Sequence, residues 1–517
     1  MTTINNVTTS SPRLKVGIIG GGIAGSTIAL RLASLGIRTY LFERNASLVS
    51  APPMCHLHAG GNLYREIPDK DCLTLLQQAI DMIRLYPHSI DVRPTVIAIP
   101  KRDSGSPLAL LPRLQLLTQR YQQLVDLDPS NQVLGKPEQY YQLFERAELE
   151  ALARQPAIAK PKTLEQWIAN ASRYLDLDTL KFPIIAVQEY GWNIFRLSAS
   201  TQLALSSEQS VTVLTNTVVT TVKPIQPITS DNRASMKQWE IHYQTQQQKE
   251  TAPNQNTHSM SVNVDYLINA CGFQTGEIDD MVGIHTERMV EFKASYIAQW
   301  QEADGALPEI IIHGQRGTPQ GMAQLTPYPN GYYQIHAMSD DITLFADGLV
   351  KSTINSAQPQ LNPTYLHYIQ HGWDKQALLN RSQKAIQFVS EFVPKFAQAL
   401  PANHALYGGQ QIPGEDDTLR VADIRSYRNQ HYIRAENVKA SSTLTVADEV
   451  IKELQALGLL NIDRLDDTIR QHHQWRYLQH HNKADIDILA TVVAKQRKFP
   501  EAMAQVITPI HTTTHNL

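Results

Sequence analysis

The chain has 517 residues, of which 42% are hydrophobic and 18% are charged, and its formal net charge is −3. This length is too great for one simple hydrophobic core, so we expect two consecutive or interleaved domains. Neither the net charge nor any long run of Lys and Arg supplies the positive field that binds phosphates, which argues against nucleic acid as a partner. The three cysteines, Cys55, Cys72 and Cys271, are too scattered for a disulfide framework, which favours the reducing cytoplasm.

The N-terminal region changes character near residue 14. Residues 1–13 are polar and lack the apolar segment of a signal peptide, so they are interpreted as a disordered lead. The segment 14–45, LKVGIIGGGIAGSTIALRLASLGIRTYLFERN, begins with a short apolar strand at 16–19. A helix follows with one apolar face, and a second strand spans 39–42. This change of hydrophobic period is typical of a βαβ unit.

A glycine-rich turn, GGGIAG, joins the first strand to the helix. Gly20 permits the tight turn, Gly22 lets backbone N–H groups approach a pyrophosphate, and Gly25 lets the helix pack closely on the strand. Ile23 and Ala24 complete the turn at the start of the helix. The pattern predicts a dinucleotide site, but it does not separate FAD from NAD.

Glu43 closes the second strand of this unit. A carboxylate at that position accepts hydrogen bonds from the ribose diol of adenosine and repels a 2′-phosphate. Arg44 follows it and is a second candidate cofactor contact, with a solvated side chain as the alternative. Its position does not make the site specific for NADP.

The segment 259–284 carries the next signal for a cofactor. An apolar strand at 266–269 leads into the small-residue turn Ala270-Cys271-Gly272 and then into a polar helix start. Such a turn brings the backbone close to a ligand at the carboxyl edge of a sheet. An ordinary strand–turn–helix remains the alternative.

The stretch VDYLINACGFQTGEIDDMVGI resembles the second FAD-contacting segment of the D-amino-acid oxidase, glycine oxidase and sarcosine or dimethylglycine dehydrogenase superfamily. The resemblance extends over about residues 14–455. It rests also on RLSASTQLAL and VTVLTNTVVTTV within 196–222, MVEFKASYIAQW at 289–300, AQLTPYPNGYYQIHA at 323–337, YGGQQIPGEDDTLRVADI at 407–424, and KASSTLTVADEVIKEL at 439–454.

The resemblance implies an α/β fold with an FAD-binding Rossmann domain of the glutathione-reductase type and an inserted antiparallel-sheet α+β substrate domain. It also implies that FAD is the cofactor, that Val218 lies near the adenine, and that Ala270 and Gly272 contact the cofactor. We expect the FAD-binding domain at 14–84, 185–285 and 405–455, the substrate domain at 85–184 and 286–404, and a helical C-terminal extension at 456–517.

The stretch MCHLHAGGNLYRE, residues 54–66, contains a run similar to one in the dimethylglycine and sarcosine dehydrogenases. In those enzymes a histidine of this loop is bonded to the 8α-methyl group of the flavin. The resemblance implies that His58 lies at the flavin ring, with Ala59 and Gly60 allowing close backbone approach. A covalent bond through His58 would raise the reduction potential of the flavin. The alternative is a non-covalent flavin, with His56 and His58 as polar loop residues.

Ser441-Ser442-Thr443 precedes an apolar helical pattern, as a serine N-cap would. In the superfamily the positive end of this helix faces the N1 and C2 carbonyl region of the flavin. The resemblance therefore implies cofactor contacts at Ser442, Thr443 and Leu444.

The sequence departs from its relatives where they bind the substrate. Amine-oxidising members usually carry an arginine for the substrate carboxylate, whereas Gln410 and Gln411 stand at the comparable positions here. This puts a simple α-amino acid substrate in doubt. Arg316 and Lys293 are candidates for the missing cation, with a solvated cation as the alternative for each. His336 is a candidate base, with a core or surface histidine as the alternative.

Other segments are not expected to carry function. Residues 223–262 are rich in Gln, Thr and Asn and are interpreted as an extended hairpin around a strand at 239–243. Residues 385–400 are interpreted as a core helix broken near Pro394 rather than a membrane contact. No stretch is long and apolar enough for a transmembrane helix. His472, His473, His480 and His481 lack further ligands at metal spacing, so no metal site is expected.

The predicted function is an FAD-dependent oxidoreductase that takes a hydride onto flavin N5 from a C–H next to N or O. A small amine, N-methyl amine or hydroxy acid is the expected substrate, and oxygen or a quinone-type carrier is the expected electron acceptor. The candidate catalytic residues are His58, His336, Arg316 and Lys293, and a cytoplasmic homodimer is expected. A tRNA-modifying flavoprotein and a non-catalytic flavin-binding or assembly protein remain as alternatives.

Overall fold

The computed structural model describes residues 14–50, 56–61, 67–225, 238–245, 259–414, 423–436, 439–461 and 482–510. The predicted disordered lead at 1–13 lies outside these residues. So do Cys55 and the four histidines between 472 and 481.

A six-stranded sheet contains the predicted βαβ unit, which the structure confirms. Strand β1 (Lys15–Ile19) leads into helix α1 (Ile23–Ser34) and then into strand β2 (Arg38–Phe42). The strand order is β19-β20-β12-β1-β2-β8, and all neighbours are parallel except β19 and β20. The other strands are β8 (Val211–Leu214), β12 (Tyr266–Asn269), β19 (Asp423–Tyr427) and β20 (Tyr432–Glu436).

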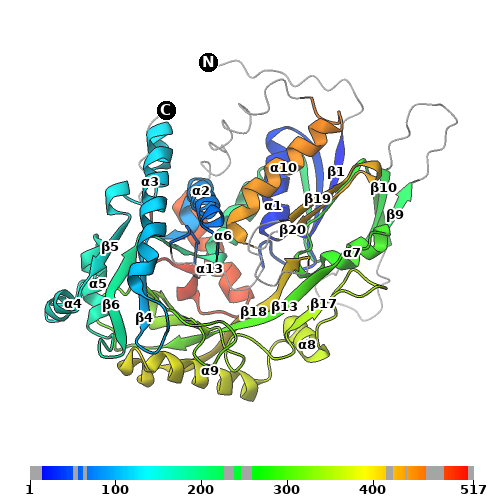
Figure 1. Ribbon diagram of the computed structural model, residues 1–517. Coiled ribbons are helices and arrows are strands. Elements are labelled where there is room, and N and C mark those ends of the chain that lie inside the picture. Colours follow the sequence, from blue (N-terminus) through cyan, green and yellow to red (C-terminus); the bar gives the residue numbers. More distant parts are fainter. Residues whose placement is uncertain are drawn as a thin grey trace.

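Both faces of the six-stranded sheet are covered, which explains why its central strands are nearly all apolar. Helices α1 and α10 (Thr443–Ala456) pack on one face (Figure 1). On the other face lies a three-stranded antiparallel sheet, and its Trp239 and Ile241 pack against Phe42 and Leu267. This small sheet contains β9 (Thr217–Ile225), β10 (Gln238–Thr245) and β11 (Ser259–Val264), so the predicted hairpin is the β10–β11 pair joined to a third strand.

A nine-stranded sheet forms the second large unit. Its order is β17-β13-β16-β15-β14-β4-β6-β5, and β18 runs along the other side of β13. The pairs are antiparallel, as predicted, except that β14 and β4 are parallel. Parallel strands need a long crossover connection. Here the chain between β4 and β14 includes β8 and β12 of the six-stranded sheet. The strands are β4 (Thr95–Pro100), β5 (Tyr141–Phe144), β6 (Leu180–Val187), β13 (Arg288–Gln299), β14 (Glu309–Ile312), β15 (Ala323–Tyr328), β16 (Tyr332–Ala337), β17 (Leu349–Lys351) and β18 (Leu400–Pro413).

The two faces of the nine-stranded sheet differ in chemistry because side chains alternate along each strand. One face is apolar and packs on α5 (Leu164–Ser172) and α9 (Lys375–Ser390), which lies beneath β13 and β18 in Figure 1. The other face contributes apolar residues such as Ile97 and Ile297 to the core around α1. That face also carries polar side chains, and we call Glu291, Lys293, Ser295, Glu309, Gln324, Gln334 and His336 the polar face.

The prediction of a core helix broken near Pro394 is confirmed. Helix α9 ends at Ser390, a short 3-10 helix begins at Pro394, and β18 begins at Leu400. Ile386 and Phe396 are buried in the core of the nine-stranded sheet.

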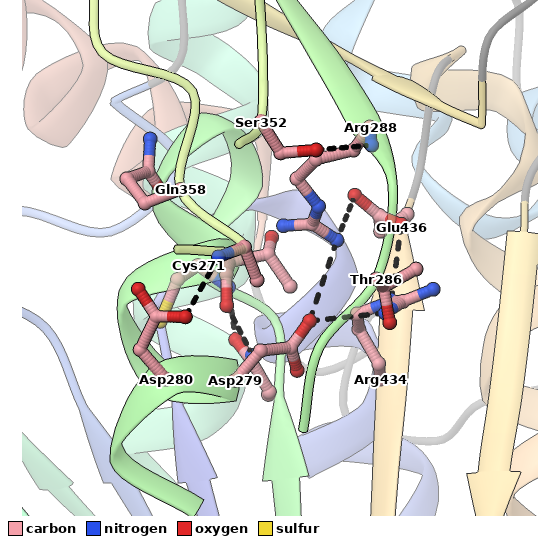
Figure 2. Close-up of polar contacts among 12 residues, drawn as sticks. Cys271, Asp279, Asp280, Thr286, Arg288, Ser352, Gln358, Arg434 and Glu436 are labelled. Carbon is pink, nitrogen blue, oxygen red and sulfur yellow. Dashed lines mark hydrogen bonds and ion pairs between the residues drawn. The ribbon is translucent and has the colours of Figure 1, made fainter. Parts of the chain in front are cut away.

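A buried ion network joins the two large sheets (Figure 2). Arg434 of β20 pairs with Asp279 of helix α7 (Thr275–Val282) at 3.0 Å and with Glu436 at 3.1 Å. Arg288, the first residue of β13, pairs with Glu436 at 2.6 Å. All four side chains are at most 1% exposed. The two guanidinium groups balance the charge of the two carboxylates. Removing any one of the four groups would leave a buried charge uncompensated.

The C-terminal region adds α13 (Lys483–Gln496), which packs beside α6 (Ile194–Ser206), and a short 3-10 helix at Glu501–Ala504. The remaining longer helices are α2 (Asp69–Leu85), α3 (Leu111–Leu127) and α8 (Pro363–His371). Within the described ranges, no helix combines the length and apolar character needed to cross a membrane.

Candidate active site

The glycine-rich turn after β1 has the geometry that a dinucleotide turn requires. Gly20 has a φ of 104°, and a Cβ there would lie 2.4 Å from the carbonyl oxygen of Ala270. A Cβ on Gly25 would lie 1.9 Å from the carbonyl oxygen of Gly20, so the close packing of α1 on the turn requires glycine. By contrast, a Cβ on Gly22 would meet nothing within 4 Å. The backbone at Gly22 therefore borders open space.

Helix α1 begins beside that open space with Ile23 and Ala24. Its N-cap, Gly22, makes no side-chain cap, and the first turn contains no acidic residue. The N–H groups of a first helical turn have no partner within the helix, and they carry a partial positive charge. This end of α1 fits the pyrophosphate of a dinucleotide.

Glu43 lies beside the same turn at the end of β2. Its carboxylate accepts hydrogen bonds from the Gly21 N–H and the Asn45 N–H, each at 2.8 Å, and burial raises the pKa of Glu43. Arg44, by contrast, is exposed. Val218 of β9 lies next to Thr217, whose N–H donates to the carbonyl oxygen of Glu43. The structure thus brings Glu43 and Val218 together at one edge of the sheet.

The turn after β12 meets the glycine-rich turn. The N–H of Ala270 donates to the Ile19 carbonyl at 2.8 Å, and Gly272 has a φ of 60°. A Cβ on Gly272 would lie 3.7 Å from Oε1 of Gln411, so this turn also borders β18. Burial raises the pKa of the Cys271 thiol, which keeps the thiol protonated near pH 7.

The loop that contains His58 meets the start of α10. The Nζ of Lys439 lies 3.1 Å from Nε2 of His58, and the rings of His56 and His58 are 4.7 Å apart. Ala59 is fully buried. Gly60 has a φ of 100°, and a Cβ on Gly60 would lie 2.6 Å from the carbonyl oxygen of Cys72. The sequence analysis did not single out Lys439, which stands in the 439–454 segment just ahead of the helix.

The start of α10 differs in one respect from the prediction. A 3-10 turn, Ala440–Ser442, precedes the helix, and Ser442 does not cap it. Instead the Ser442 hydroxyl donates to the Lys439 carbonyl at 2.7 Å, because the 3-10 turn places that oxygen within its reach. Thr443 donates to the carbonyl of Ile23 at 3.1 Å, which fixes the N-termini of α10 and α1 side by side. Leu444 is buried behind them.

His56 forms the centre of a buried ion network that the sequence analysis missed. Its Nδ1 lies 2.8 Å from Glu309 and its Nε2 lies 3.4 Å from Glu189, and both carboxylates are fully buried. Burial opposes the charged imidazole, but Glu309 and Glu189 outweigh it and raise the pKa of His56 to about 9. Burial likewise opposes the charged Glu309, but His56 and Arg93 lower its pKa to about 2.

His336 lies on the polar face, opposite Gln324 in the register of β15 and β16. It is half-buried, and burial lowers the pKa of His336 to about 4. The charges of Glu309, Lys293, His56 and Lys439 also act on the pKa of His336, so these groups lie within electrostatic range of it. The structure therefore gathers the predicted His336 and Lys293 with three charged residues that the sequence analysis did not name as catalytic.

Lys293 and Arg316 share one carboxylate. The Nζ of Lys293 lies 2.6 Å from Glu291 and donates to Gln410 at 2.8 Å, and Arg316 pairs with the other oxygen of Glu291. The two cationic side chains are 15% and 26% exposed, respectively. The alternative for each was a solvated loop cation. Neither side chain is fully solvated, because β13 and the loop after β14 bring both to Glu291.

The family comparison matches the model described as "DAO: FAD dependent oxidoreductase" to residues 15–423. Among similar solved structures, glycine oxidase from Geobacillus kaustophilus has a TM-score of 0.51, is 12% identical, and covers 88% of this chain and 98% of its own. L-proline dehydrogenase from P. horikoshii has a TM-score of 0.53, with 13% identity and coverages of 89% and 98%.

A third similar structure is L-alpha-glycerophosphate oxidase from Mycoplasma pneumoniae with FAD bound, with a TM-score of 0.50, 13% identity, and coverages of 85% and 94%. The comparison with curated proteins gave no match. The family match spans most of the chain, and the open backbone at Gly22, the fixed Glu43 carboxylate and the paired N-termini of α1 and α10 fit FAD. The chain therefore belongs to the DAO family of FAD-dependent oxidoreductases, and FAD is its cofactor.

Proposed function

We propose that this enzyme oxidises a small anionic substrate at a C–H bond next to nitrogen or oxygen, on the polar face of the nine-stranded sheet. An amine or N-methyl amine that carries a carboxylate or phosphate would fit this description, and so would a hydroxy acid. The observation that carries the proposal is the grouping of His336 with Lys293 and Arg316 around that face. Bound FAD supplies the hydride acceptor, flavin N5.

The cofactor would be held at two ends by different segments. The turn from Gly20 to Gly25 and the carboxylate of Glu43 would bind the adenosine and pyrophosphate half. The loop from His58 to Gly61 and the start of α10 would hold the ring. Lys439 and the N-terminus of α10 place positive charge at that end, which favours negative charge on a group bound beside them.

His336 is the group that we propose as acceptor of the substrate proton. Because burial lowers the pKa of His336 to about 4, its imidazole is neutral near pH 7 and can act as a base. An alcohol substrate must lose its hydroxyl proton as the hydride leaves, so a hydroxy acid would use this base fully. An amine must be bound unprotonated for its hydride to leave, so reduction by an amine would depend less on His336.

Lys293 and Arg316 would recognise the anionic group. Lys293 and Arg316 both pair with the carboxylate of Glu291, which places two cationic side chains at this point of the polar face. The Lys293 ammonium also orients the side chain of Gln410, which stands where relatives carry an arginine. A substrate carboxylate or phosphate could thus bind from the β13 side of the site rather than from β18.

Anaerobic reduction of the holoenzyme tests this proposal. Each substrate would be paired with a neutral counterpart, such as the amide or ester of the same acid, and bleaching of the flavin absorbance would be followed. The names of the similar structures suggest glycine, proline and glycerophosphate as a first panel, followed by N-methyl amines and hydroxy acids. We expect at least one anionic compound to bleach the flavin faster than its neutral counterpart. Equal rates for every pair would overturn the proposal.

The electron acceptor and the cellular setting form part of the same proposal. Oxygen or a quinone-type carrier would reoxidise the reduced enzyme, and the rate of return of flavin absorbance with each acceptor separates the two. The low cysteine content supports a cytoplasmic location. A homodimer is the assembly that we propose, to be checked by sedimentation.

A further inference from the structure

The C-terminal segment 482–510 lies outside the region that the family model matches, which ends at residue 423. It is nevertheless built into the body of the protein. The ring of Phe499 lies 5.4 Å from that of Phe195 in α6, and Asn193 donates to the carbonyls of Met503 and Gln505. Figure 1 shows α13 beside α6, within the body of the molecule.

Arg497, just after α13, reaches the loop that follows β2. Its guanidinium donates to the Leu48 carbonyl at 2.8 Å, to the Ser47 hydroxyl at 2.9 Å and to the Ser198 hydroxyl at 3.1 Å. Ser198 also donates to the Leu48 carbonyl at 2.6 Å, so α6 and the C-terminal segment hold this loop together.

The loop held by Arg497 connects the two parts of the predicted adenosine site. It begins after Glu43 and returns to the glycine-rich turn, where the Val49 N–H donates to the Gly21 carbonyl at 2.9 Å. The fit is close, since a Cβ on Gly21 would lie 2.7 Å from the side chains of both Glu43 and Leu48. Leu48 therefore packs directly against the turn that is proposed to bind the pyrophosphate.

The charge of Arg497 is only partly balanced by its neighbours. The three acceptors named above are neutral oxygens, and burial lowers the pKa of Arg497 to about 10, with the Glu43 carboxylate opposing that shift. A doubly negative pyrophosphate at the N-terminus of α1 would attract the Arg497 cation through long-range electrostatics.

We propose that Arg497 is a cofactor-positioning residue that the C-terminal segment supplies to the FAD site. It acts through residues 44–49, which it holds in the shape that binds the adenosine and pyrophosphate half of FAD. This role does not depend on which substrate the enzyme oxidises.

The test uses the full-length apoprotein and two probes, FAD and ADP, with binding measured by calorimetry or by quenching of flavin fluorescence. ADP reports on the adenosine end alone and requires no turnover. The variants are Arg497→Ala and Arg497→Lys. Lys495→Ala is the matched control, since Lys495 stands two residues earlier and pairs with Glu501 at the surface, at 2.8 Å.

We expect Arg497→Ala to weaken the binding of both FAD and ADP by about tenfold to a hundredfold, because hydrogen bonds from a charged group are lost. The two affinities of Arg497→Lys should fall between those of the wild type and Arg497→Ala, and those of Lys495→Ala should match the wild type within about twofold. A purely structural clamp would instead lower the melting temperature of the apoprotein and leave ADP binding unchanged, and that result would overturn the proposal. If Arg497→Ala does not fold, the ADP affinity of Arg497→Lys decides.

Discussion

His56 and Glu309 form a fully buried ion pair, with 2.8 Å between Nδ1 and Oε1, that joins the loop after β2 to the nine-stranded sheet. The pair connects residues 253 positions apart in the sequence. Because it holds the loop that contains His58 against the polar face, it links the proposed ring-binding end of the cofactor site to the proposed substrate site.

The first prediction concerns stability at alkaline pH. His56 has a pKa of about 9 in the folded protein, above its ordinary value of 6.5. Its stabilising effect is therefore fully present below pH 6.5 and is lost as the pH rises through 9. The free energy of unfolding should fall by up to about 3 kcal/mol across that window. Denaturant unfolding between pH 6 and pH 10 measures this.

His56→Gln should flatten that pH dependence, since an amide does not titrate. His367→Gln, on the exposed surface of α8, is the matched control and should keep the wild-type slope. A wild-type stability that stays constant from pH 6 to pH 10 would show that His56 is not charged in the folded state.

The second prediction concerns His336. If it is the base, His336→Asn should slow flavin reduction by a hydroxy acid by about 10²-fold or more, and reduction by an amine by less. Because the folded pKa of His336 is about 4, the wild-type rate should lose this contribution only as the pH falls toward 4. Stopped-flow reduction under anaerobic conditions measures both effects. The control variant His242→Asn, in the three-stranded sheet, should leave the rate unchanged. If His336→Asn reduces its flavin as fast as His242→Asn does, His336 is not the base.

The third prediction concerns the link between His58 and the flavin. An ammonium has only donors, so Lys439 donates to Nε2 of His58, and a covalent bond to the flavin would have to form at Nδ1 or displace Lys439. We expect a non-covalent flavin whose colour stays in the supernatant after acid precipitation. Colour in the pellet that disappears in His58→Ala would instead demonstrate the covalent bond.

The fourth prediction concerns the ion network between the sheets. Glu436→Gln removes one of two carboxylates that face two buried guanidinium groups, so it should destabilise the protein by about 3–5 kcal/mol. The double variant Arg288→Met with Glu436→Met should lose less than the sum of the two single changes. Arg146→Met, which breaks a surface pair, serves as the control for chemical denaturation and should show no measurable change. Additive losses would mean that the pairing in Figure 2 is not energetically coupled.

The sequence allowed good predictions where the signal is local. The turn from Gly20 to Gly25, the strand at 266–269 and the broken helix near Pro394 each depend on neighbouring residues, and the structure has all three. Gln334 and His336 share a face of β16, as alternation along a strand dictates, and they lie opposite Thr326 and Gln324 of β15.

What the sequence did not reveal depends on pairing between distant segments. Glu309 begins a short apolar strand and looks like an ordinary polar boundary, yet β14 aligns it with Thr95 of β4 and brings it to His56. The parallel pairing of β4 and β14 carries no local signal. Lys439 stands where a helix start was expected, and its contact with His58 spans 381 positions.

The most direct test of the account is anaerobic titration of the holoenzyme and of Lys293→Met with an anionic substrate that bleaches the flavin. Lys293 lies in β13, outside the segments proposed to hold FAD, and shares Glu291 with Arg316. We expect an unchanged FAD content and a substrate concentration for half-bleaching that rises by about tenfold or more in Lys293→Met. The same half-bleaching concentration in both proteins, or a substrate set restricted to uncharged compounds, would contradict it.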